Sequence, residues 1–131
     1  MASGTEILLS RDLVEFQLFD WLGVGAEDER EAFVAVIEMS QRLAADLFLP
    51  HHRLSDIEEP RLEAGAVRIL PAIRSALARF AELGMFAVSF PESLGGLGLP
   101  APIALVVQGN FAAASIATAA YPLLTVANAR L

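Results

Sequence analysis

The sequence predicts an all-α fold, an orthogonal multi-helix bundle of about five helices with one or two short extended segments. Apolar side chains recur at three- and four-residue spacing through most of the chain, and Gly, Pro and Ser residues separate these stretches. Not one charged side chain occurs from Ser93 to Ala129, and 55% of all residues are hydrophobic. A chain with so much apolar surface usually folds inside a larger protein, in an oligomer or in a membrane.

Charge is divided unevenly along the chain, whose formal net charge is −7. Residues 1–66 hold 14 acidic residues and 5 arginines, whereas residues 67–131 hold 2 and 4. We expect no nucleic-acid partner, because phosphate neutralisation needs a basic face. The absence of cysteine excludes disulfides and thiolate metal sites. The opening MASGTEILLS lacks the basic and apolar regions of a secretory signal, so we expect a cytoplasmic protein.

A short amphipathic helix is predicted between Ser10 and Gly23. Ser10 can cap its first turn, and Gly23 can adopt the left-handed turn that ends it. Leu9 and Val14 stand at the positions of a hydrophobic staple around that cap. The helical spacing predicts a buried face formed by Leu13, Phe16, Phe19 and Leu22. We expect Phe19 and Trp21 to pack this helix against its own domain.

The second helix is predicted from Asp28 to Phe48, with acidic residues in its first turn, where negative charge is favourable. Its apolar stripe consists of Phe33, Val36, Ile37, Leu43, Leu47 and Phe48. Pro50 is expected to stop it. His51 and His52 then follow on an extended segment, where neighbouring side chains point apart. We therefore expect hydrogen-bonded or solvated loop histidines and not a metal site.

Residues 53–66 are predicted to form a polar loop, because Glu59-Pro60 breaks a helix, and residues 66–70 a brief extended piece. Pro71 suits the first position of a third helix, which buries Ile73, Leu77 and Phe80 and ends at Gly84. An extended run is expected over residues 84–88.

The glycines at 95, 96 and 98 imitate a dinucleotide-binding fingerprint, an interpretation that we reject. The glycines do not directly follow a strand, Pro100 lacks an N–H where pyrophosphate would bind, and no acid lies about twenty residues further on. Glycines that permit unusual turns before a helix explain the loop more simply.

A fourth helix is predicted from Pro100 to about Ala119 or Ala120, and a fifth from Thr125. The uncharged length of the fourth meets the usual criterion for a membrane span. Gln108, Gly109 and Asn110 in its middle, its alanine-rich composition and the absence of a basic flank argue against that interpretation. We expect instead a helix buried on nearly all sides, and no membrane span.

Several motifs occur in an order that resembles the N-terminal helical domain of acyl-CoA dehydrogenases. They are FLPHHR, RLEAGAVRILP, FAELGMFAVSFPESLGGLGLP and YPLLT, which follows the uncharged helix. The resemblance covers residues 28–131, and RDLVEFQLFDWLG resembles the N-terminal extension of a subset of the family. It thus divides the chain into an extension with a short helix, residues 1–27, and the helical domain, residues 28–131. Gln108, Gly109 and Asn110 depart from the family, whose members often have an acidic pair there.

The resemblance implies a longer parent enzyme with a middle β domain and a C-terminal four-helix bundle. Family members carry FAD, abstract the α-proton of an acyl-CoA with a glutamate and pass the β-hydride to the flavin. That glutamate and most flavin contacts belong to the other domains, so no catalytic or cofactor-binding residue is assigned here. This chain alone is expected to be inactive and without cofactor. Its implied role is one wall of the acyl pocket, with candidate substrate-binding residues Tyr121, Leu123, Leu124 and Thr125.

The expected partners are the other domains of the same enzyme, acyl-CoA and further copies in a homo-oligomer. The alternative function is a self-standing helical module for protein interaction or oligomerisation. The high apolar fraction and the uneven charge are compatible with that alternative as well.

Overall fold

The computed structural model describes residues 8–131. Its first half contains α1 (Arg11–Glu15), α2 (Arg30–Leu43) and α3 (His52–Ile57), followed by a hairpin of β1 (Arg61–Glu63) and β2 (Ala66–Arg68). Its second half contains α4 (Pro71–Glu82), α5 (Ala101–Ala114) and α6 (Ile116–Ala129). Short 3₁₀ turns and two π-helical segments, Phe16–Trp21 and Ala44–Phe48, connect or extend these helices. The described chain is a helical bundle, as predicted.

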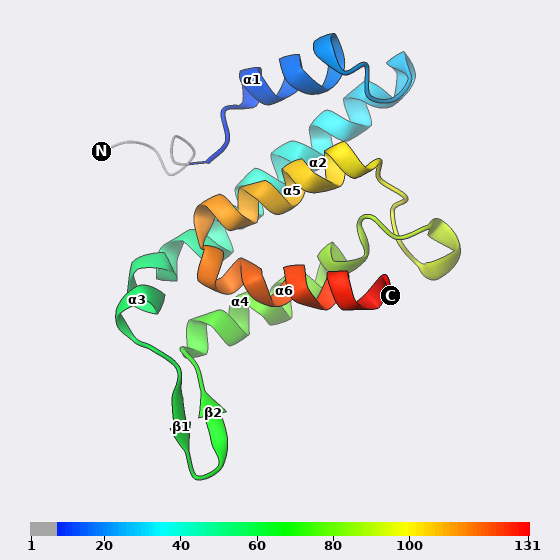
Figure 1. Cartoon of the computed structure of the whole chain (residues 1–131). Coiled ribbons are helices and arrows are strands. Elements are labelled where there is room, and N and C mark those ends of the chain that lie inside the picture. Colours follow the sequence, from blue (N-terminus) through cyan, green and yellow to red (C-terminus); the bar gives the residue numbers. More distant parts are fainter. Residues whose placement is uncertain (1–7) are drawn as a thin grey trace.

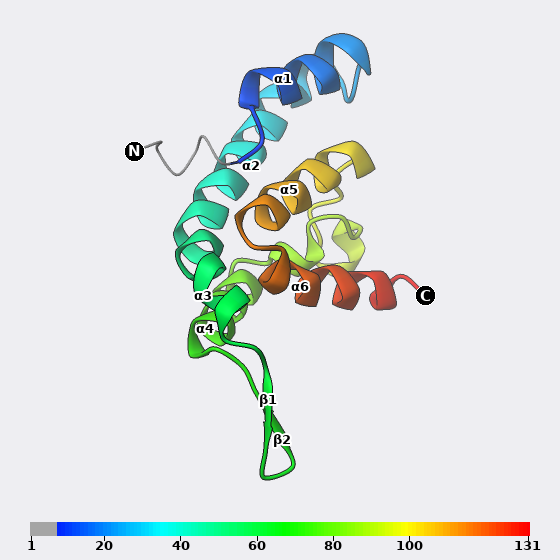
Figure 2. The same ribbon diagram turned by 60° about the vertical axis from the view of Figure 1, so that its left-hand side comes forward.

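α2 and α5 pack side by side at the centre of the bundle, and α6 folds back from α5 to lie against α3 and α4 (Figure 1). α1 lies at the opposite end of the molecule from the hairpin, which projects from the bundle in both views (Figure 2). This arrangement brings α2, from the acidic first half of the sequence, against α5, from the uncharged segment of residues 93–129.

The main core is centred on three phenylalanines from three different segments. The ring of Phe48 lies 4.9 Å from that of Phe111 and 5.9 Å from that of Phe80, centroid to centroid. Phe80 and Phe111 meet edge to face at 4.9 Å, a favoured aromatic geometry. Ala44, Ala114 and Val107 fill the space around them. The helical stripe predicted for the second helix therefore packs onto α4 and α5.

A second, smaller core lies beneath α1. Val14 and Leu18 are buried there against Phe33, Ile37 and Ile103. The predicted buried face of the first helix is wrong, because Leu13, Phe16 and Leu22 are exposed and Phe19 is only partly buried. Trp21 is 73% exposed and does not pack against the domain. Val14 and Leu18 stand four residues apart, which is an ordinary helical spacing, so the buried stripe is one neighbouring the predicted stripe. The chain becomes π-helical only from Phe16, after Leu13 and Val14 have taken these positions.

The cap and the end of this first helix are confirmed only in part. Ser10 makes no side-chain capping bond, although its carbonyl accepts from the Val14 N–H at 3.0 Å. Leu9 and Val14 pack in the same cluster, as the staple predicts. Gly23 follows the helix with a φ of 62°. Arg11 pairs with Glu15 of its own helix and with Glu38 of α2, which joins the two helices.

The helical path does not stop at Pro50, so that prediction is wrong. Pro50 lies in the 3₁₀ turn Leu49–His51, at a position where a missing N–H is tolerated, and α3 follows to Ile57. The two histidines therefore occupy helical positions and not an extended segment. The polar loop predicted for residues 53–66 is replaced by α3 and strand β1.

The hairpin confirms part of the extended segment predicted over residues 66–70. β2 pairs with β1 in the register Arg61↔Arg68, Leu62↔Val67 and Glu63↔Ala66. Ala64 (φ 49°) and Gly65 (φ 77°) form the two-residue turn, both in the left-handed region that such hairpin turns require.

α4 is confirmed, from Pro71 to a left-handed Gly84 at φ 72°. The extended run predicted after it is wrong, because Met85–Ala87 form a 3₁₀ turn that buries Met85. The Gly-rich loop then folds tightly on itself before α5.

The long fourth helix is wrong in its extent. The chain leaves helical geometry at Ser115 (φ −163°, ψ 100°), so α5 ends at Ala114 and α6 begins at Ile116. No new helix begins at Thr125, which lies inside α6, and Pro122 is accommodated within the same helix. No helix between residues 8 and 131 combines the length and apolar character needed to cross a membrane.

Candidate apolar site between α5 and α6

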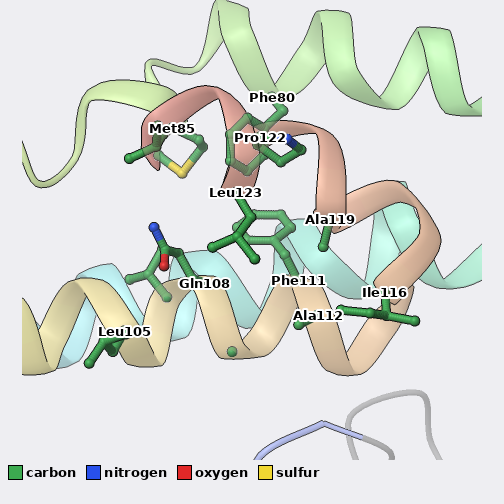
Figure 3. A pocket seen from close by; sticks show the side chains of 13 residues that line it. Phe80, Met85, Leu105, Gln108, Phe111, Ala112, Ile116, Ala119, Pro122 and Leu123 are labelled. Atoms are coloured by element: carbon green, nitrogen blue, oxygen red, sulfur yellow. The ribbon is translucent and has the colours of Figure 1, made fainter. Parts of the chain in front are cut away.

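An apolar cavity of about 230 Å³ lies between α5, α6 and the end of α4. Figure 3 shows its lining, with Phe111 coming from α5, Leu123 from α6, and Phe80 and Met85 from α4 and the 3₁₀ turn that follows it. Leu105 and Ile116 stand toward its two ends. Among the lining residues that the structure describes, Gln108 alone has a polar side chain, so the cavity suits an alkyl group.

The sequence produces this cavity because small residues lie on the facing side of α5. Gly109 and Ala112 contribute little volume, and α6 turns back sharply at Ser115. Gly109 also lies beneath Leu9, whose Cδ1 would be only 3.1 Å from a Cβ at this position. The mid-helix glycine that departs from the family pattern therefore allows the chain at Leu9 to cross α5 closely.

The cavity opens onto an exposed apolar surface, which we call the α5/α6 face and define as Leu105, Ile116 and Leu123. Each of these side chains is between 47% and 66% exposed. Because residues 93–129 carry no charge, nothing on α5 or α6 repels an apolar partner or ligand. Such a surface normally marks a place where another molecule or domain binds.

The four predicted substrate-binding residues all lie on α6, but only Leu123 lines the cavity. Leu124 and Tyr121 are exposed elsewhere on the helix. The Thr125 hydroxyl donates to the Tyr121 carbonyl of its own helix at 2.8 Å. The sequence prediction missed Ala119, Pro122 and Val126, which line the cavity with Leu123. Their spacing of three and four residues would have identified them if α6 had been predicted as one helix.

The glycine loop does not form a phosphate site. The N–H groups of Gly95, Gly96 and Gly98 donate to the carbonyls of Glu92, Pro91 and Phe90, at 2.9, 3.1 and 2.9 Å. A Cβ on Gly96 would lie 2.0 Å from the Phe90 carbonyl oxygen. The loop is therefore a packed turn in which all three glycine amides are already hydrogen-bonded, which supports the structural interpretation of these glycines.

The described residues do not fit a flavin on their own. The glycine amides are occupied, and the α5/α6 cavity has neither a charged group nor the polar edge that a flavin ring requires. Between residues 8 and 131, His, Cys, Asp and Glu side chains form no cluster of three or more that could hold a metal ion.

Three buried polar contacts hold the helices that frame the cavity. His51 Nε2 lies 2.7 Å from Thr118 Oγ1, and Ser115 Oγ donates to the same oxygen at 3.3 Å. The Asn110 amide donates to Ser40 Oγ at 2.9 Å. Burial lowers the pKa of His51, and the neighbouring His52 lowers that pKa further. His51 is thus a hydrogen-bonded histidine, as predicted, although it is buried and helical.

No protein-family model matches the sequence. The chain is nevertheless similar to an enzyme of the acyl-CoA dehydrogenase class. This relative is the 3-methylmercaptopropionyl-CoA dehydrogenase of Ruegeria pomeroyi, to which the chain is 28% identical over 100 residues. The matched region covers 76% of this chain and 17% of the relative, so the chain corresponds to a small part of that enzyme.

Proposed function

We propose that this chain is the N-terminal helical domain of an FAD-dependent acyl-CoA dehydrogenase and forms one wall of its acyl pocket. The observation that carries the proposal is the 28% identity over 100 residues to an acyl-CoA dehydrogenase. The motifs that resemble the family point to the same enzyme class. The helical bundle and its uncharged last third are compatible with this role.

The α5/α6 cavity supports an acyl-binding role. Burying an alkyl chain is favourable by about 0.8 kcal/mol for each CH₂ group. The wall formed by Phe111, Leu123 and Ile116 offers such burial, and its open side leaves room for another domain to complete the pocket. In the proposed enzyme this wall binds the acyl chain, orients it and excludes water from it.

Proton abstraction is assigned to residues outside this chain. Among residues 8–131, no acidic or basic side chain lines the α5/α6 cavity, so this part of the wall has no group to take a proton from a bound acyl group. FAD, when held by the other domains, supplies the redox chemistry by accepting a hydride. The 131-residue chain alone is therefore expected to be colourless and inactive.

Leu123 is the strongest of the proposed substrate-binding residues, because it lines the cavity and is partly exposed at its opening. Tyr121, Leu124 and Thr125 are proposed to lie near the boundary with a neighbouring domain. We also propose that the complete enzyme assembles as a homo-oligomer.

The second candidate function is a self-standing helical interaction module. The exposed α5/α6 face favours it, because an apolar face of this kind can also bind a separate protein. Sedimentation separates the two functions. A natural module gives one discrete oligomer through this face, whereas a domain separated from its enzyme gives dye binding and polydisperse species.

The deciding experiment expresses the gene with whatever coding sequence follows Leu131. The expected product is yellow, and its flavin absorption bleaches when an acyl-CoA is added anaerobically. Leu123→Trp should raise KM for acyl-CoA more than kcat falls, whereas Leu124→Trp, outside the cavity, should change KM less. A stop codon directly after Leu131, with a colourless product, would refute the enzyme assignment.

A further inference from the structure

The β1–β2 hairpin is the least supported element of the described structure. It projects from the bundle in both views, and its strands make no extensive contact with a helix (Figures 1 and 2). Every residue from Arg61 to Arg68 is exposed. The apolar pair Leu62 and Val67 is 76% and 62% exposed. A two-stranded hairpin is marginally stable alone in water, so this one gains stability from any strand added to it.

β1 has an unpaired edge, because the sheet of residues 8–131 contains only two strands. With a two-residue turn, the closing pair Glu63–Ala66 is the hydrogen-bonded kind. Pairs alternate along an antiparallel ladder, so Leu62–Val67 is the non-hydrogen-bonded kind. The backbone N–H and C=O of Leu62 therefore point to the free edge of β1.

Charge on the hairpin is arranged so that β1 complements itself. Arg61 lies directly opposite Arg68 in the register, and like charges in that position are destabilising. Within the hairpin Arg68 is compensated by Glu63, 4.0 Å away, through an exposed and therefore weak ion pair, whereas Arg61 has no such partner among residues 8–131. Arg61 and Glu63 stand on either side of Leu62, on the same face of the strand. If a second β1 runs antiparallel beside the first with Leu62 at the centre, each Arg61 meets the Glu63 of the other copy.

We propose that two copies of this chain pair through their β1 edges around a two-fold axis at Leu62. The result is a four-stranded sheet in the order β2-β1-β1-β2, with the two Leu62 residues exchanging backbone hydrogen bonds. One face carries the Leu62 and Val67 side chains of both copies, and the other carries two compensated Arg61–Glu63 pairs. β2 offers no such match, because Ala66 and Arg68 flank Val67.

Pro60 limits the size of this contact. It lacks an N–H and immediately precedes β1, so the ladder is confined to three residues of each copy. That area is well below the roughly 1,000 Å² of a stable specific interface. The proposed dimer is therefore weak and forms at high protein concentration. It does not depend on the dehydrogenase assignment or on the α5/α6 face.

Cysteine crosslinking tests the geometry in the 131-residue chain, which has no cysteine of its own. Leu62→Cys places the two thiols on the axis, about 5.5 Å apart between Cα atoms, which a disulfide can span. Val67→Cys is the matched control, because the two β2 strands lie three strand spacings apart, about 14 Å. Rapid oxidation to a disulfide dimer with Leu62→Cys and little with Val67→Cys is expected. Equal rates for the two variants would overturn the proposal.

Charge reversal tests the pairing by sedimentation at high concentration. Arg61→Glu and Glu63→Arg should each weaken the dimer, by about 2- to 30-fold for two lost charge pairs. The double variant Arg61→Glu/Glu63→Arg restores both pairs and should recover dimerisation. Circular dichroism confirms that each variant is folded, which is expected for exposed sites away from the core. A double variant weaker than both single ones, or a wild-type chain that stays monomeric at millimolar concentration, contradicts the proposed pairing.

Discussion

The imidazole of His51 lies 2.7 Å from the hydroxyl of Thr118, across 67 residues of sequence. This contact joins the turn before α3 to the first turns of α6, and both side chains are buried. The Thr118 hydroxyl also accepts a hydrogen bond from Ser115, the residue at which the chain turns from α5 into α6. The contact therefore helps to fix the angle at which α6 leaves α5.

Stability should depend on pH through His51. Burial lowers the folded-state pKa of His51 below the unfolded value of 6.5, so the unfolded chain binds more protons at mildly acidic pH. The stabilisation of the fold by neutral His51 is therefore fully present above pH 6.5, and it is lost as the pH falls through the lowered folded-state pKa. Urea unfolding at pH 7.5 and below pH 6.5 measures this loss.

Carboxylates also titrate under acidic conditions, so the comparison needs a variant. His51→Gln keeps a donor for Thr118 but removes the titration, and its stability should fall less below pH 6.5 than that of the wild type. His52→Gln, at the exposed neighbour, should retain most of the wild-type pH dependence. Identical pH profiles for wild type and His51→Gln would show that His51 does not contribute.

Ser40 and Asn110 form a buried hydrogen-bonded pair, and substituting one or the other should change the unfolding free energy by different amounts. Ser40→Ala leaves the Asn110 amide without its 2.9 Å acceptor and should cost about 1–3 kcal/mol of unfolding free energy. The Asn110 Oδ1 atom has no hydrogen-bond partner among residues 8–131. Asn110→Leu removes both the unpaired oxygen and the donated hydrogen bond, while Ser40 Oγ still donates to the Ile37 carbonyl at 2.7 Å. The unfolding free energy should therefore change by less than about 1 kcal/mol. Two variants that both destabilise by more than about 2 kcal/mol would contradict this account.

Alanine substitutions at two positions of the glycine loop, Gly96 and Gly98, should lower the stability of the fold by very different amounts. Gly96→Ala puts a Cβ 2.0 Å from the Phe90 carbonyl oxygen, so the backbone must move, and a loss of about 3 kcal/mol or more is expected. In Gly98→Ala the new Cβ has no neighbour within 4 Å, so the substitution causes no clash. The loss of stability comes only from holding an alanine in the left-handed conformation at φ +61°, and should be about 1–2 kcal/mol. Thermal unfolding of both variants measures the difference, and equal losses would contradict it.

Ligand binding to the α5/α6 cavity can be measured in the chain itself. A short alkyl carboxylate should shift the methyl NMR signals of Leu123 and Ile116, which line the cavity, but not those of Leu54, which lies outside it. Leu123→Trp should fill the cavity and abolish these shifts, whereas Leu124→Trp should leave them. Shifts that persist in Leu123→Trp would place the ligand elsewhere.

The elements predicted correctly are those that local sequence determines. α4 has Pro71 at its start, a left-handed Gly84 at its end and apolar residues between them, and these signals depend on no distant contact. The stripe of α2 was found because its apolar spacing is regular over several turns.

The errors occur where tertiary contacts decide the conformation. Ser115 breaks the uncharged segment where the Ser115 and Thr118 hydroxyls meet near His51, a contact that no local pattern indicates. Val14 and Leu18, four residues apart, form the buried face of the first helix. Packing onto Phe33 and Ile103 selects this stripe over the neighbouring one, and those residues are distant in sequence. Leu123 was predicted, but the other α6 residues of the cavity depended on the correct helix boundary.

The pairing of α2 with α5 also has a consequence for the order of folding during synthesis. The apolar stripe of α2 is made first, but its buried partner Asn110 follows Ser40 by 70 residues. Contacts of such high sequence separation form slowly and only after the whole intervening chain exists. The acidic first half therefore emerges from the ribosome before α5 is available to pack on α2, and its net negative charge favours its solubility during that interval.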